Sequence, residues 1–285
     1  MAKPQKRIVE AEEFVLKDSG GKSRAVLGIV ADGPGLMLLD SNEKPRAMLA
    51  VIADEPQMTL YDPNGEQRVN LTVAANGAGL ALLDRNGEPR ALLTEGPEGP
   101  QLALCDDSGR LRATLDVVAD EPSLLLRDAD GHVRAGLVFE KTGPRLTLFD
   151  AKGSARAGLG LFPDATGLTF GDEKGEQRVG LSITPDGPML LLSDSTGHPR
   201  ACLTLTADGP RLSFADAGGT QGIRLFMRSA GPGVLLSDNK GKGRAGLSVT
   251  PDGPRFDLYD ADGGARFTVA LTPEGAGLAI FDAKG

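Results

Sequence analysis

The sequence predicts an all-β protein built from tandem repeats of 22 residues. Thirteen aspartates occur at this spacing, from Asp18 to Asp282, with no insertion or deletion. Three residues after the aspartate stands glycine, except in the repeat with Glu43. Between these turn signals apolar residues alternate with small or polar ones, which is typical of β-strands. A fixed period of roughly 20–50 residues is the signature of repeat architectures, so we expect one continuous array.

Each repeat contains two strand segments, numbered here from the repeat aspartate as position 0. The first covers positions 6 to 12, with apolar residues at 7, 9 and 11, such as Ala135, Leu137 and Phe139. The second covers positions 17 to 21, with apolar residues at 18 and 20, such as Leu146 and Leu148. Twelve first segments and thirteen second segments predict 25 short strands.

Two turns connect the strands. Asp62-Pro63-Asn64-Gly65 suits a type I turn, because aspartate accepts from the backbone, proline presets φ and glycine takes a left-handed φ. The second connection, Asp-Gly-Pro as in Asp186-Gly187-Pro188, also predicts a tight turn. Two short loops per repeat place all five apolar positions on one face of a sheet.

The opposite face is unusually poor in charge. Positions 8, 10, 17 and 19 give 48 sites in twelve repeats, and glycine, alanine, serine and threonine predominate there. A sheet surface facing water normally carries polar and charged residues. We therefore expect this face too to be covered, by another sheet or by another chain. The charged exceptions at these sites are six: Asp116, Arg145, Arg211, Arg224, Arg255 and Asp257.

These patterns favour an elongated array of β-β repeats, either a solenoid or a shaft like that of a fibre. The alternative is a closed β-propeller, in which two repeats form a 44-residue blade of four strands. Inner and outer propeller strands differ, yet odd and even repeats show no firm alternation. We expect residues 1–12 to form a charged lead-in and residues 13–285 to form a single array.

The repeat has weak likenesses to known proteins. The string from Glu13 to Ala25, EFVLKDSGGKSRA, resembles a tandem repeat of uncharacterised bacterial proteins, and that resemblance covers nearly the whole chain. It implies no activity. The Leu-x-Leu-x-Asp-x-x-Gly hairpin is also similar in kind to the repeats of trimeric viral fibre shafts, which are shorter, and to the tyrosine-aspartate repeats of toxin shells, which are richer in aromatics.

Composition excludes several classes of function. The net charge of -8 argues against nucleic acid as a partner. No apolar run approaches the roughly 18 residues of a membrane span. The basic start is followed by Glu10, Glu12 and Glu13 instead of an apolar segment, so we expect no signal peptide. A cytoplasmic location, or release by lysis or a dedicated export route, is consistent with this. The two cysteines, Cys105 and Cys202, are not equivalent, so no disulfide framework is expected.

The repeat aspartates raise the question of metal binding. Calcium needs six or more oxygen ligands and usually a distal glutamate, and most repeats lack a second acid. We therefore predict turn-forming aspartates, no metal and no cofactor. The alternative is a calcium site, for which the candidates are Asp128, Asp130, Asp260 and Asp262.

The other polar residues of the repeat have simple roles in this interpretation. Arginine at position 6 either pairs with a turn aspartate or binds a polyanion, and we favour pairing. His132 and His198 follow the turn glycine and should be exposed. No nucleophile has a base held beside it, so we predict that the protein is not an enzyme.

Two repeats are irregular. After Asp216 the position-6 arginine is replaced by Gly222, and Arg224, Phe226 and Arg228 form a basic, aromatic strip that is the candidate for a partner contact. A second break is Glu95 at an apolar position, which we expect to shorten a strand.

The sequence thus predicts a structural or assembly repeat protein, a rigid fibre, shaft or scaffold that associates with itself as a homo-oligomer or filament. The alternative is a binding module that presents turn residues to a protein or glycan partner.

Overall fold

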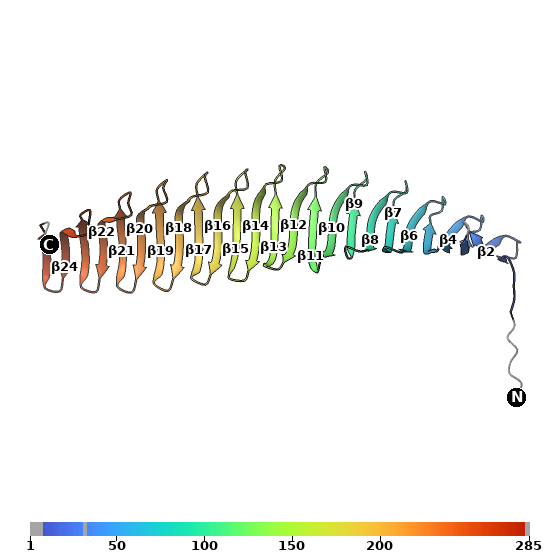
Figure 1. Ribbon diagram of the computed structural model, residues 1–285, viewed down its shortest axis with the longest axis horizontal. Helices are drawn as coiled ribbons and strands as arrows, with labels where there is room; N and C mark the ends of the chain where they lie inside the picture. Colours follow the sequence, from blue (N-terminus) through green and yellow to red (C-terminus); the bar gives the residue numbers. More distant parts are fainter. Residues whose placement is uncertain (1–7, 31–32, 283–285) are drawn as a thin grey trace, which may run out of the picture. The chain divides into compact units, whose positions relative to one another are not determined.

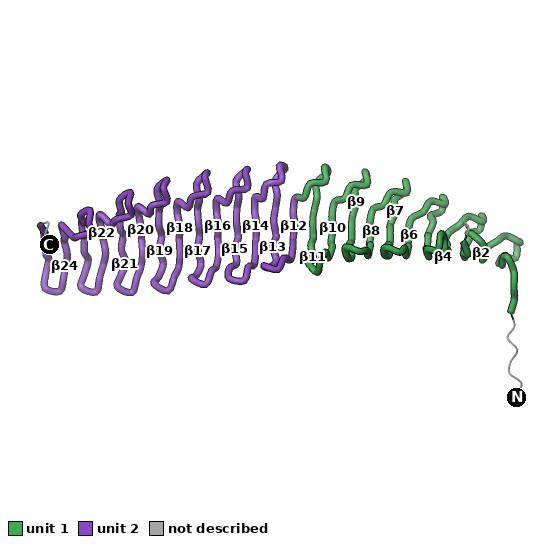
Figure 2. Tube along the Cα trace, viewed as in Figure 1, with its two compact units in different colours: residues 1–133 green, residues 134–285 purple. Residues whose placement is uncertain are grey.

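The computed structural model describes residues 8–30 and 33–282, and these residues form 25 β-strands and no helix (Figure 1). The all-β tandem hairpin array predicted from the sequence is confirmed. The chain divides into two compact units, Met1–Val133 and Arg134–Gly285, which are coloured separately in Figure 2. In the described residues, no helix is long and apolar enough to cross a membrane.

The strands of each unit follow one another in chain order. Those of the first unit are β1 (Phe14–Lys17), β2 (Ser23–Val30), β3 (Gly33–Leu39), β4 (Pro45–Ile52), β5 (Glu55–Tyr61), β6 (Gln67–Ala74), β7 (Gly77–Leu83), β8 (Pro89–Glu95), β9 (Gln101–Cys105), β10 (Leu111–Val118) and β11 (Glu121–Arg127). Those of the second unit are β12 (Val133–Glu140, from the boundary residue), β13 (Gly143–Phe149), β14 (Ala155–Phe162), β15 (Ala165–Gly171), β16 (Gln177–Thr184), β17 (Gly187–Ser193), β18 (Pro199–Thr206), β19 (Gly209–Ala215), β20 (Gln221–Arg228), β21 (Gly231–Ser237), β22 (Gly243–Thr250), β23 (Gly253–Tyr259), β24 (Ala265–Thr272) and β25 (Gly275–Ile280).

In most repeats the second strand begins two residues earlier than predicted, because positions 15 and 16, often Gly-Pro, belong to the strand; β9, which begins at Gln101, is an exception. In β17, Gly187 pairs with Thr184 and Pro188 with Ile183, which leaves a loop of two residues. Proline has no N–H for the following strand, so the β17–β18 ladder starts only at Met189. In β15 the same position holds Thr166, which does pair with the next strand. Reading Gly-Pro as part of the turn was therefore wrong by two residues.

Every pairing within a unit is antiparallel and joins strands that are neighbours in the chain. β17, for example, pairs with β16 on one side and with β18 on the other. The hydrogen-bond ladder therefore continues from one repeat to the next within a unit. In a propeller it would be interrupted between blades. The sheet is open in each unit over the described residues, so the closed propeller is not formed.

The two faces of the sheet differ in composition. The apolar face carries positions 7, 9, 11, 18 and 20, and its central row runs across the strands as Leu181, Leu190 and Leu203. The small-residue face carries positions 8, 10, 17 and 19, for instance Thr59 and Ala103. The alternation predicted from the sequence is confirmed.

Each unit is a single layer over the described residues, and no second sheet of the chain covers either face. Leu181 and Leu203 on the apolar face are 51% and 46% exposed. The most buried side chains lie instead on the small-residue face, where Thr59 is 1% exposed. Thr59 lies between Met48 and Asn70 of the adjacent strands, so longer neighbours shield a short side chain. Cover by another sheet of this chain is therefore not found within either unit, and cover by another chain stays a prediction.

The break at Glu95 has the predicted effect. β8 ends at Glu95 and β9 begins only at Gln101, so this hairpin has shorter strands and a longer loop than its neighbours. The loop is closed by a hydrogen bond of 2.9 Å from Gly99 N to Gly96 O.

Candidate functional site

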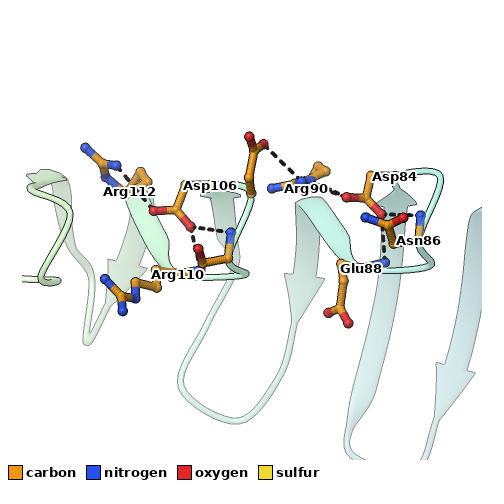
Figure 3. Close-up of polar contacts among 9 residues, drawn as sticks. Asp84, Asn86, Glu88, Arg90, Asp106, Arg110 and Arg112 are labelled. Carbon is orange, nitrogen blue, oxygen red and sulfur yellow. Dashed lines mark hydrogen bonds and ion pairs between the residues drawn. The ribbon is translucent and has the colours of Figure 1, made fainter.

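The repeat aspartate organises its own turn through both carboxylate oxygens. Oδ1 of Asp84 accepts the backbone N–H groups of Asn86 at 2.7 Å and Glu88 at 3.1 Å (Figure 3). Oδ2 of Asp84 accepts from Nε and Nη2 of Arg90 at 3.0 and 2.6 Å. Glycine follows because this turn requires a left-handed φ, which is +82° at Gly87.

The arginine row pairs with the turns, as the favoured interpretation predicts. N to O distances range, for example, from 2.5 Å in Arg244–Asp238 to 3.8 Å in Arg24–Asp18. Some arginines also reach the following turn, since Nη2 of Arg46 donates to Pro63 O at 3.1 Å. The row therefore joins successive hairpins. The further pairs are Arg46–Asp40, Arg68–Asp62, Arg90–Asp84, Arg112–Asp106, Arg156–Asp150, Arg178–Asp172, Arg200–Asp194 and Arg266–Asp260.

These contacts lower the pKa of the turn carboxyls. The pKa of Asp194 falls from 3.8 to about 2, because the side chain and backbone of Thr196 donate to it, followed by the backbone of His198 and the charge of Arg200. For Asp62 the side chain of Arg68 is the largest cause of the lowered pKa.

We expect acid to destabilise the fold through these carboxyls. A folded pKa below the unfolded value contributes stability that is complete above about pH 4 and is lost as pH falls through the folded pKa. The Asp194→Asn variant should therefore be less stable than wild type at pH 7, with the difference shrinking between about pH 4 and pH 2. Urea unfolding followed by circular dichroism across this range measures it. A difference that is constant with pH would contradict the role of the ionised carboxylate.

The calcium candidates are used as turn formers. Oδ1 of Asp128 accepts from the backbone N of Asp130 at 2.9 Å. Oδ1 of Asp260 accepts from the backbone N of Asp262 at 2.9 Å, and its Oδ2 accepts from Nε of Arg266 at 2.6 Å. Ligand atoms of Asp128, Asp130 and the exposed His132 lie within 4.8 Å of one another. Three such groups fall short of the six oxygens that calcium requires.

The predicted partner strip lies on β20, on the small-residue face. Arg224, Phe226 and Arg228 alternate along this strand with apolar residues of the opposite face, as expected. The Arg228 guanidinium carbon lies 4.5 Å from the centre of the Phe226 ring. The register adds Arg211 of β19, which stands directly opposite Phe226.

A hollow of about 120 Å³ lies beside this strip on strands β19 to β23. We call it the basic–aromatic hollow, and its floor is formed by Gly246 and Ser248 of β22. Phe226, Leu235 and Tyr259 contribute apolar walls. The arginines at its border are Arg211, Arg224 and Arg228.

The acid in the hollow, Asp257, already forms an ion pair with Arg255. It is 5% exposed, accepts from Nε of Arg255 at 2.7 and 2.8 Å, and accepts from Oγ1 of Thr268 at 2.6 Å. Burial alone raises the pKa of Asp257, but the Arg255 and Thr268 hydrogen bonds outweigh it and hold the pKa below 3.8. The pKa of Tyr259 is raised by burial and by the charge of Asp257.

Sequence reasoning found the strip but missed the cluster. Four of the six charges at the small-residue positions, Arg211, Arg224, Arg255 and Asp257, come together on the second unit. Only the register between strands shows this, because Arg211 and Phe226 lie in different repeats. All four residues occupy positions of the small-residue face, and this shared face was the sequence signal that could have predicted the cluster.

Comparison with known proteins does not assign the chain to a family. No family model and no curated protein matches the chain. One solved structure that resembles it is the Photorhabdus luminescens Tc holotoxin pore carrying a TccC3 mutation, with 7% sequence identity and a TM-score of 0.17. That match covers 91% of this chain and 15% of the toxin chain, and a TM-score this low supports no argument. The resemblance to bacterial tandem-repeat proteins stays a prediction.

Proposed function

We propose that this protein is a non-enzymatic structural or assembly protein that associates with itself through its apolar face. The observation that carries the proposal is the continuous row of half-exposed leucines, of which Leu181 and Leu203 are members. Exposed apolar patches beyond a few hundred Å² mark interaction surfaces or aggregation-prone ones.

A second copy of this chain is the occupant that the apolar face suits. The same positions carry aliphatic or aromatic side chains in nearly every repeat, and in the described residues Glu95 is the only charge among positions 7, 9, 11, 18 and 20. A surface without charges gives an unrelated partner no basis for electrostatic selection. Within a unit, two identical faces of uniform period match each other in the manner of two packed sheets.

The charged turns explain why association would use the faces and not the rims. The turns concentrate Asp-Arg pairs and lysines along the strand ends, where they stay hydrated. Face-to-face packing buries the apolar rows and leaves these groups in water, which avoids the cost of desolvating ion pairs.

Sedimentation equilibrium of the full chain between nanomolar and micromolar concentration tests the proposal. We expect a discrete multiple of the 29.6 kDa monomer mass that dissociates on dilution. A monomer at every concentration would refute self-association, and a mixed complex that forms only with another protein would favour a binding module instead.

A further inference from the structure

We propose that the basic–aromatic hollow of the second unit binds an acidic sugar residue, one that carries a carboxylate on a pyranose ring. The site lies on the small-residue face and is thus independent of the apolar face used in the proposed assembly.

The arginines of the hollow lack the carboxylate partners that most arginines at position 6 have. Arg211, Arg224 and Arg228 make no ion pair in the described structure, and the contact of Arg228 is with the Phe226 ring. The arginine row, by contrast, is paired with turn aspartates, and Arg145 of the same face is paired with Glu140 at 2.5 Å. In a chain of net charge -8, three unpaired guanidinium groups at one hollow leave a local site for an oxyanion.

The apolar side chains that line the hollow favour a ligand in which the anionic group is attached to a ring. They do not favour a small inorganic anion. Phe226 reaches Gly233, where an added Cβ would lie 2.6 Å from Cζ of its ring, so one edge of the ring lies against the sheet. Tyr259 and Leu235 also line the hollow, and both lie within 4 Å of a Cβ built on Gly246. Binding sites typically combine apolar and aromatic walls with a few polar groups that fix orientation. An inorganic anion would leave these walls without contacts.

The size of the hollow limits the ligand to one such ring. Its volume of about 120 Å³ is below the roughly 300–1,000 Å³ of sites that enclose larger ligands. Ser248 in the floor offers a hydroxyl group, while Asp257 is occupied by Arg255 and Thr268. A planar carboxylate can accept two parallel N–H groups from one guanidinium, which fits an arginine-lined site.

Calorimetric titration of the full chain with trigalacturonate tests the assignment, with neutral trigalactose and sodium sulfate as comparisons. We expect binding of trigalacturonate, none of trigalactose, and weaker binding of sulfate. Arg224→Gln should weaken trigalacturonate binding at least about tenfold. Arg145→Gln, the control on the same face, should leave it unchanged.

A second variant fills the hollow without changing its charge. Gly246 has room for a Cβ, since the nearest atoms are Tyr259 Oη at 3.5 Å and Cε2 at 3.6 Å. Gly246→Leu should abolish binding while the melting temperature is maintained. Gly167→Leu is the matched control, because Gly167 also lies on the small-residue face with no atom closer than 3.5 Å.

The outcomes separate the alternatives. Equal loss in Arg224→Gln and Arg145→Gln would mean unspecific attraction and overturn the site. If sulfate bound as tightly as trigalacturonate, the hollow would be a site for anions in general, and the assignment of an acidic sugar would be wrong. If trigalacturonate gave no binding heat, there would be neither a sugar site nor an anion site. Monomeric galacturonate that binds as well as the trimer supports a single-residue site, and tighter binding of the trimer supports a residue within a longer glycan. Sedimentation of the same variants should be unchanged, so this proposal and self-association fail independently.

Discussion

Replacing Leu181 and Leu203 with lysine is expected to dissociate the assembled protein, raising its dissociation constant at least about a hundredfold. Each side chain is about half exposed in one copy, so lysine at these sites is compatible with the fold of a single chain. In an assembly covered face to face, the same lysines would be buried without partners, at a cost of several kcal/mol each. Sedimentation velocity measures the dissociation, and circular dichroism checks the fold.

The chain offers a matched control one residue further along each strand. Ser182 and Thr204 follow Leu181 and Leu203 but point to the small-residue face, because side chains alternate along a strand. Ser182→Lys with Thr204→Lys adds the same charge to the same strands and should leave the assembly intact. If both pairs dissociated the protein equally, repulsion between charges would explain the loss, and the apolar face would not be the interface.

Replacing Gly187 with alanine is expected to cost about twice as much stability as the same change at Gly275. Both follow a proline and an acid, and their φ angles are +120° and +134°. An added Cβ at Gly187 would lie 2.0 Å from Leu205 O of the next hairpin, whereas Gly275, in the last hairpin, has no atom within 4 Å. The conformation alone costs about 1–3 kcal/mol at either site, and the displaced neighbour adds about 1–3 kcal/mol at Gly187.

The proline excludes at Gly187 the kind of turn that precedes β5. In the turn before β5, Ala53 and Asp54 take the positive φ values of 51° and 66°, and a glutamate follows. Pro185 cannot take a positive φ. The turn with Pro163 and Asp164 holds alanine at this position, and the φ of Ala165 is not positive. We therefore expect the Gly187→Ala variant to fold through an adjusted turn, with lower stability. Urea unfolding of both variants provides the comparison, and equal losses would contradict the contact between neighbouring hairpins.

The local chemistry of the repeat was predictable from its sequence. The Asp-x-x-Gly turn depends on residues within four positions of one another, as in Asp62 and Glu66. The strand alternation and the shortened strand at Glu95 likewise follow from short patterns. The start of the second strand was missed because Gly-Pro is common in turns, whereas here Pro188 lies at a position that needs no N–H for the next strand.

Features that depend on register or on other chains could not be predicted. The alternation shows that both faces are poor in charge, but it does not show whether a second layer belongs to the same chain. Each unit has one layer, so cover by another chain is the alternative that stays a prediction. The hollow was half predicted: Arg224, Phe226 and Arg228 were found from one irregular repeat, while Arg211 and Tyr259 come from other repeats and are placed only by strand pairing.

Thiol alkylation on the two faces tests the covered apolar face most directly. In a background carrying Cys105→Ser and Cys202→Ser, one variant carries Leu203→Cys and the other Thr204→Cys, on opposite faces of β18. We predict that the Leu203→Cys thiol reacts more slowly in assembled protein than after dilution to monomer, while the rate for Thr204→Cys changes little. A Leu203→Cys thiol that reacts at one rate across the dilution would contradict the account.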